Sequence, residues 1–160
     1  TRSLLRVFSA PFKIQHQDKT MAQPPHALSH FAAAIWLGSF TAIGVWVVPT
    51  LFQVLDKSLA GQIGARLFSV QSSVSLLAVA AIWLGLRKTA LRRSKLVLFA
   101  LLLAVVAALL QEYAIAPQII AKTNPALWHR LGGVAFALQW LCAAVLLWQM
   151  TSPKAYANQS

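Results

Sequence analysis

Residues 131–150 read LGGVAFALQWLCAAVLLWQM and contain no charged side chain. A helix of about 20 such residues is long enough to cross the ~30 Å hydrocarbon core of a bilayer. Three further stretches are also uncharged, at 31–55, 67–86 and 96–111. The whole chain is 58% hydrophobic and only 11% charged, whereas soluble domains carry about 25% charged residues. The sequence therefore predicts an all-α polytopic membrane protein, a bundle of four transmembrane helices.

These stretches divide the 160-residue chain into a membrane domain and two tails. We expect a basic tail at 1–25, a four-helix transmembrane domain at 26–150 and a short tail at 151–160. Between the first two spans, residues 53–66 mix apolar and polar side chains, which predicts a short interfacial helix. The basic composition of the first tail is typical of an organelle-targeting segment. Alternatively, the residues before Met21 belong to an extension of the membrane domain. The expected spans are about 27–50, 67–86, 95–117 and 129–150.

The net charge of +11 comes from 14 Lys and Arg residues against 3 Asp and Glu residues. No nucleic-acid-binding motif accompanies this charge, so we expect anionic lipid headgroups rather than nucleic acid as its partner. Most of the basic residues fall in the tails and in the connection between the second and third spans. The positive-inside rule then places both termini inside, in the bacterial cytoplasm or the mitochondrial matrix, with the chain integral to the inner membrane. In that connection the residues expected at lipid headgroups are Arg87, Lys88, Arg92, Arg93 and Lys95.

Small residues recur at steps of four along three of the expected spans. Helices in a membrane pack through small side chains, because lipid offers no hydrophobic gain for bringing large apolar faces together. We therefore expect these rows to face the interior of the bundle. The predicted helix-packing residues are Ala34 and Gly38 in the first span, Ala104 and Ala108 in the third, and Gly133 in the fourth.

Glu112 is the only acidic residue within the four expected spans. An unpaired carboxylate at that depth costs several kcal/mol or stays protonated. The topology brings the end of the third span close to the last connection, so Glu112 is predicted to pair with one of Arg66, His129 and Arg130 in a buried polar cluster. Such a cluster acts either as a tie that fixes helix register or as a proton or ligand site.

Two histidines, His26 and His30, lie one helical turn apart where the first span begins. They share one face and can hold a metal from one side, whereas a haem iron takes axial ligands from opposite sides. His129 is expected at the other boundary of the membrane, too far away to complete such a pair. We therefore expect no cofactor and interpret His26 and His30 as headgroup-level residues. A surface metal site, such as copper, or a single-ligand haem site stays open as an alternative.

Catalytic groups are not evident in the sequence. Cys142 is the only cysteine, so no intrachain disulfide forms. We find no nucleophile beside a base, no paired carboxylates and no glycine-rich phosphate loop. The chain is therefore expected to be non-enzymatic.

A resemblance to a known family is carried by AIWLGSFTAIGVWVVPTLFQVLDKSLAGQIGARLFSV at 34–70, QEYAIAPQI at 111–119 and WHRLGG at 128–133. These stretches resemble the domain of unknown function 4149 family, small four-span membrane proteins similar to eukaryotic transmembrane protein 205. The resemblance covers roughly residues 27–150 and implies a fold but no reaction. HALSHFAAAIWLG, at 26–38, is more distantly similar to the first helix of membrane protoporphyrinogen oxidase and copper-resistance D-type proteins, which implies a haem or copper role for that helix.

Three functions are compatible with these features. The first is an accessory or structural subunit of a larger membrane complex, such as a respiratory one, whose partners are other membrane subunits and lipids. The second is a haem- or metal-binding membrane protein that uses His26 or His30. The third is a small transporter or lipid-interacting protein that uses Glu112.

Overall fold

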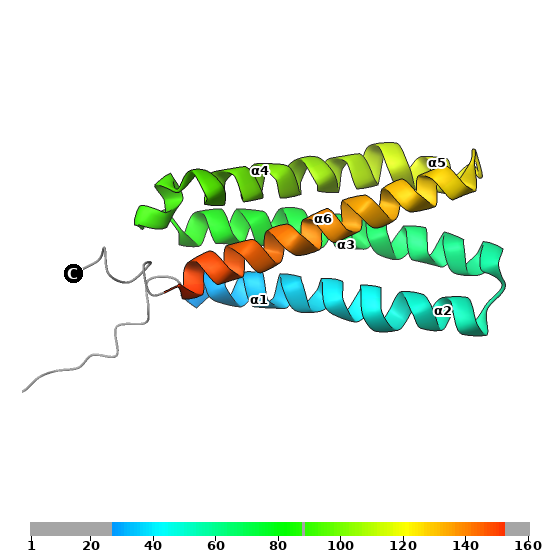
Figure 1. Ribbon diagram of the computed structural model, residues 1–160, viewed down its shortest axis with the longest axis horizontal. Coiled ribbons are helices and arrows are strands. Elements are labelled where there is room, and N and C mark those ends of the chain that lie inside the picture. Colours follow the sequence, from blue (N-terminus) through cyan, green and yellow to red (C-terminus); the bar gives the residue numbers. More distant parts are fainter. Residues whose placement is uncertain (1–26, 88, 153–160) are drawn as a thin grey trace, which may run out of the picture.

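The computed structural model describes residues 27–87 and 89–152, which form four long rods joined by short connections (Figure 1). The first rod runs through α1 (Ala27–Thr41), a π-helical turn η1 (Ala42–Val47) and α2 (Val48–Val54). The second is α3 (Lys57–Gly85), followed by a short 3₁₀ turn η2 (Ala90–Arg93). The third runs through α4 (Lys95–Leu110), a second π-helical turn η3 (Gln111–Ile115) and α5 (Ala116–Ile120), and the fourth is α6 (Pro125–Thr151).

All four rods are long and apolar enough to cross a membrane, at 27–54, 57–85, 95–120 and 125–151. The predicted four-helix membrane bundle is confirmed. The tail predicted at 1–25, His26, Lys88 and residues 153–160 lie outside the described residues.

Successive rods run in opposite directions, and each packs on the next (Figure 1). The fourth rod returns to contact the first, so the order around the bundle is α1, α3, α4, α6. We call the end with the connections 55–56 and 121–124 the turn end, and the end with the connection 86–94 the loop end. Because α3 and α6 both run from the turn end to the loop end, residues equally far along them lie at similar depths.

The separate interfacial helix predicted at 53–66 is wrong. Leu55 is extended, with φ −121° and ψ 157°, and from Lys57 onward the chain is one 29-residue helix. The small residues in this region are buried against the bundle, so its mixed pattern reflects one packed face rather than a helix lying on the membrane surface. These buried residues are Ala60, Gly61, Gly64 and Ala65.

Both π-helical turns directly precede a helix that carries a proline in its first turn, Pro49 in α2 and Pro117 in α5. A proline has no backbone N–H, and its ring collides with the carbonyl four residues earlier in an α-helix. Winding the preceding turn more widely relieves that collision. The first and third rods are therefore interrupted near the turn end, whereas α3 and α6 are continuous.

The larger cluster of buried apolar residues lies in the loop half, and it includes large side chains of α1 and small ones of α4. Trp36 and Phe40 are fully buried there beside Ala104. Nearer the turn end, the Phe136 ring on α6 packs against Phe40 and Phe68, with ring centroids 4.6 Å and 4.8 Å apart. These aromatic contacts join α1, α3 and α6.

At Gly85, α3 comes very close to α1. A Cβ atom there would overlap the Ser29 side chain and come within 3.2 Å of the Ser29 backbone nitrogen. We expect Gly85→Ala to push the two helices apart and lower the free energy of unfolding by about 1 to 2 kcal/mol. Thermal unfolding in mild detergent measures this loss.

Gly64→Ala is the matched control for Gly85→Ala. Gly64 is also buried on α3, but a Cβ atom there meets nothing within 4 Å. It should leave stability unchanged or raise it slightly, because alanine favours helix more than glycine does. Equal losses in the two variants would contradict the close approach at Gly85.

Candidate functional site

A chain of hydrogen bonds ties α1 to α3 inside the bundle. The Trp36 indole Nε1 donates to Ser75 Oγ at 2.9 Å, and the Gln71 amide Nε2 donates to Ser39 Oγ at 2.8 Å. The two serine hydroxyls in turn donate to the backbone carbonyls of Gln71 and Trp36. Because these groups satisfy one another, they fix the register of the two helices.

Two more glutamines are buried without a full set of partners. Gln139 lies three residues after Phe136, as Gln71 lies three residues after Phe68. The backbone of each glutamine is therefore about 4.5 Å closer to the loop end than that of its phenylalanine. Gln139 Nε2 donates to the Ala135 carbonyl at 3.3 Å, while its Oε1 has no partner among the described residues.

Gln111, in η3, is 1% exposed, and neither of its amide atoms has a partner within the described part of the chain. It lies beside Gly132, where a Cβ atom would stand 3.5 Å from Gln111 Nε2. Gln111 was not among the site residues predicted from the sequence, whereas its charged neighbour Glu112 was. A signal was present, since a glutamine in a long apolar stretch must face protein to avoid lipid.

Glu112 is half-buried, and its carboxylate accepts a hydrogen bond from the Ser69 hydroxyl on α3. The predicted ion pair is not found: across residues 27–87 and 89–152, Glu112 has no ion-pair contact with Arg66, His129 or Arg130. Arg66 precedes Ser69 by one helical turn on α3, and it is the Ser69 hydroxyl that bonds the carboxylate. Of the predicted cluster, Arg66 alone shares a hollow with Glu112, and this hollow has a volume of about 400 Å³.

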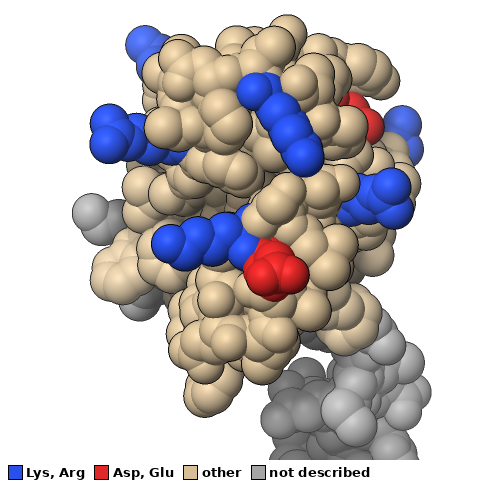
Figure 2. Space-filling model, turned by 90° about the vertical axis from the view of Figure 1, so that its right-hand side faces the viewer, with Lys and Arg blue, Asp and Glu red and all other residues tan. Residues whose placement is uncertain are grey.

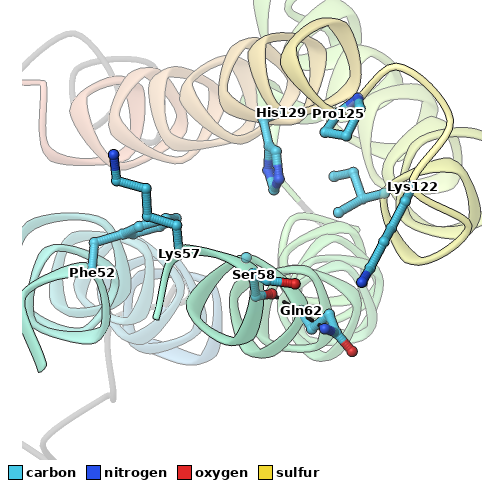
Figure 3. A pocket seen from close by; sticks show the side chains of 9 residues that line it. Phe52, Lys57, Ser58, Gln62, Lys122, Pro125 and His129 are labelled. Atoms are coloured by element: carbon cyan, nitrogen blue, oxygen red, sulfur yellow. Dashed lines mark hydrogen bonds between the residues drawn. The ribbon is translucent and has the colours of Figure 1, made fainter. Parts of the chain in front are cut away.

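His129 belongs to a different cavity, at the turn end between the first turns of α3 and α6 (Figure 3). Its ring lies over Gly61, where a Cβ atom would come within 3.2 Å of the ring. Figure 3 shows Lys57 and Lys122 on opposite sides of this ring. The cavity has a volume of about 500 Å³ and is lined by Phe52, Lys57, Ser58, Gly61, Gln62, Ile119, Lys122, Pro125 and His129.

The exposed surface of the turn end carries Lys and Arg side chains on several sides, and acidic side chains lie next to some of them (Figure 2). Arg130 is exposed and does not line the cavity. Several basic side chains therefore lie at the turn end, but among those described only Lys57 and Lys122 line the cavity.

The loop end carries the other basic cluster. Arg92 lies over the Trp83 ring, 4.6 Å from its centroid. Arg87, Arg92 and Arg93 line a hollow of about 820 Å³ between η2 and the end of α3. Lys95, at the start of α4, is also exposed at this end. These positions suit the predicted headgroup level, and contact with lipid stays a prediction.

The histidines do not form one site. His30 Nε2 lies 3.0 Å from the Met150 carbonyl oxygen near the loop end, whereas His129 lies at the turn end. Among the residues described, no three His, Cys, Asp or Glu side chains are close enough together to hold a metal ion. Haem or metal binding by His26 or His30 stays a prediction, and a purified protein without Soret absorption or bound metal would contradict it.

Two of the predicted packing rows face outward. Ala104 and Ala108 are fully buried, as expected, but Ala34, Gly38 and Gly133 are exposed on the surface of the bundle. On α1 the bulky Trp36 and Phe40 fill the core, which turns the small row away from it. On α6 the buried glycine is Gly132, which packs against Ile115.

Comparison with known proteins finds one family. Residues 31–125 match the family described as Domain of unknown function (DUF4149). This match spans the first three rods and ends where α6 begins, so it includes Lys57, Gly61 and Lys122 but not His129. No curated protein and no solved structure matches the chain.

Proposed function

Because the chain belongs to the DUF4149 family, whose description assigns no activity, we propose from its geometry that it is an accessory membrane subunit. In this proposal it binds a transmembrane helix of a larger membrane complex through the outer surface of α1 and α6. Its polar interior holds its own helices in register and performs no reaction.

The supporting observation is the row of small residues that faces away from the core. We define the small-residue face as Ala34, Gly38, Thr41 and Ala42 on α1 with Gly133 and Ala137 on α6, all of them exposed. Trp140 Nε1 donates to Thr41 Oγ1 at 3.0 Å, and from this level the row on α1 extends toward the loop end and the row on α6 toward the turn end. A Cβ atom at Gly38 or Gly133 meets nothing within 4 Å. Such rows let a second backbone approach closely in a membrane, where close packing drives helix association.

We expect leucine at Gly38 and Gly133 together to release the partner. Both side chains would project from the small-residue face and hold another helix away. Native gel electrophoresis of membranes in mild detergent should show the unaltered chain in a complex larger than the monomer, and the double variant mainly as monomer.

Ala80→Leu provides the control, since Ala80 is exposed on α3, away from this face. This variant should remain in the complex. A monomeric unaltered chain, or a double variant that stays assembled, would contradict the subunit proposal.

We further propose that the loop end faces the cytoplasm or the mitochondrial matrix, since Arg87, Arg92, Arg93 and Lys95 gather there. With Cys142 replaced by alanine, a cysteine at Thr123 should react with an impermeant maleimide in intact cells or mitoplasts. A cysteine at Arg93 should react only after the membrane is opened. The reverse pattern of labelling would show the opposite orientation.

A further inference from the structure

We infer that the cavity between the first turns of α3 and α6 binds a phosphate group, carried either by a lipid headgroup or by a small soluble ligand. This site is separate from the small-residue face, and its existence does not depend on the subunit proposal. Three features support it: the charge of its lining, the helix ends that face it, and its shape.

The lining is basic. Lys57 and Lys122 stand on either side of His129, and Ser58 and Gln62 add hydroxyl and amide groups (Figure 3). None of the residues that line the cavity is acidic. The nearest acid in sequence, Asp56, precedes Lys57, is exposed and is not part of the lining. Lys57 comes from the first turn of α3 and Lys122 from the connection 121–124, and among the described residues that line the cavity there is no acidic side chain to neutralise them.

Two long helices begin at the cavity. Lys57 and Ser58 open the 29-residue α3, and Pro125 opens the 27-residue α6. Neither N-cap residue, Asp56 or Asn124, makes a side-chain hydrogen bond to its helix. The first backbone N–H groups of α3 therefore lack a side-chain cap, and the positive ends of both helix dipoles favour an anion nearby.

The shape fits a phosphate attached to an apolar group better than a bare ion. The His129 ring packs closely on Gly61, where a Cβ atom would come within 3.2 Å of it, so a glycine at this position lets the ring lie against α3. Phe52 and Ile119 form apolar walls below the charged rim, and the whole cavity measures about 500 Å³. It lies at one end of all four spans, which is the level of lipid headgroups in a membrane.

The test uses the full chain in nanodiscs of phosphatidylcholine, with labelled phosphatidylglycerol and inorganic phosphate as separate probes. We expect Lys57→Gln and Lys122→Gln each to weaken binding about tenfold, because each removes one charge-assisted hydrogen bond. Gly61→Leu should abolish binding while every charge remains, because its side chain would displace the His129 ring and enter the cavity.

Arg130→Gln is the matched control. Arg130 follows His129 on the same helix turn and is exposed, but it does not line the cavity. Its loss should change binding less than about twofold, since charges at a distance are screened by salt. Lys57 and Lys122 are exposed, so their variants should fold even where Gly61→Leu does not, and thermal unfolding verifies this.

The two probes distinguish the source of the phosphate. If phosphatidylglycerol binds in a lysine-dependent way and inorganic phosphate does not bind, the cavity is a site for a lipid headgroup. If inorganic phosphate binds in a lysine-dependent way and phosphatidylglycerol does not bind, the cavity is a site for a soluble phosphate. The inference is overturned if neither probe depends on Lys57 and Lys122. It is also overturned if Arg130→Gln weakens binding as much as they do, since that indicates a general attraction of the basic surface.

Discussion

Trp36→Ala is expected to lower the free energy of unfolding by about 3 kcal/mol. The Trp36 indole is fully buried, meets the edge of the Phe40 ring with centroids 6.2 Å apart, and donates to Ser75. In a membrane the helices stay in lipid when their packing is lost, so the penalty comes mainly from lost contacts and the cavity left behind. Losing the Ser75 hydrogen bond adds to it.

Circular dichroism during titration with a denaturing detergent measures this change without depending on tryptophan fluorescence. Trp46→Ala is the matched control, because Trp46 lies in the same rod but is 72% exposed. Its removal should cost less than about 0.5 kcal/mol. If the two tryptophans proved equally important, the packing of α1 described above would be wrong.

Gln111→Leu is expected to raise the free energy of unfolding by up to about 3 kcal/mol. The amide is 1% exposed, and both of its polar atoms lack partners among the described residues. Leucine has a similar volume, so it fills the same place between η3 and Gly132 without a desolvated amide. The same detergent titration measures the gain.

Gln53→Leu provides the comparison, since Gln53 is exposed on α2 and its replacement should be nearly neutral. Destabilisation by Gln111→Leu would reverse the expected sign. It would mean that the amide is hydrogen-bonded in the native membrane, which would make Gln111 a binding group rather than a structural cost.

The number of spans and their approximate positions could be predicted because they depend on the hydropathy along the chain, but the start of the second span at Lys57 could not, because the mixed pattern of 53–66 looks the same in an interfacial helix and in a packed one. Which residues of each helix face the core could not be predicted. In a helix with 3.6 residues per turn, a row of residues spaced four apart rotates by about 40° around the axis at each step. From Ala100 through Ala104 and Ala108 to Glu112 this drift reaches about 120°. That is why Gln111 is buried and Glu112 lies at the margin.

The cavity was beyond prediction for a different reason. Lys57 begins α3 and Lys122 lies in the connection 121–124, and only the order of the rods around the bundle brings them to the same cavity. The exposed row of Ala34 and Gly38 shows a related limit. A sequence reveals that a helix has a small face, but not whether that face meets its own chain or another.

The two interrupted rods have a mechanical consequence for the cavity. Its apolar walls, Phe52 and Ile119, lie on α2 and α5, the short segments beyond Pro49 and Pro117. Its Lys57 and His129 are carried by α3 and α6, which have no such joint. Bending at the two prolines would therefore move the apolar walls of the cavity while Lys57 and His129 keep their spacing, so the proposed site could change its width without changing the distance between these two polar groups.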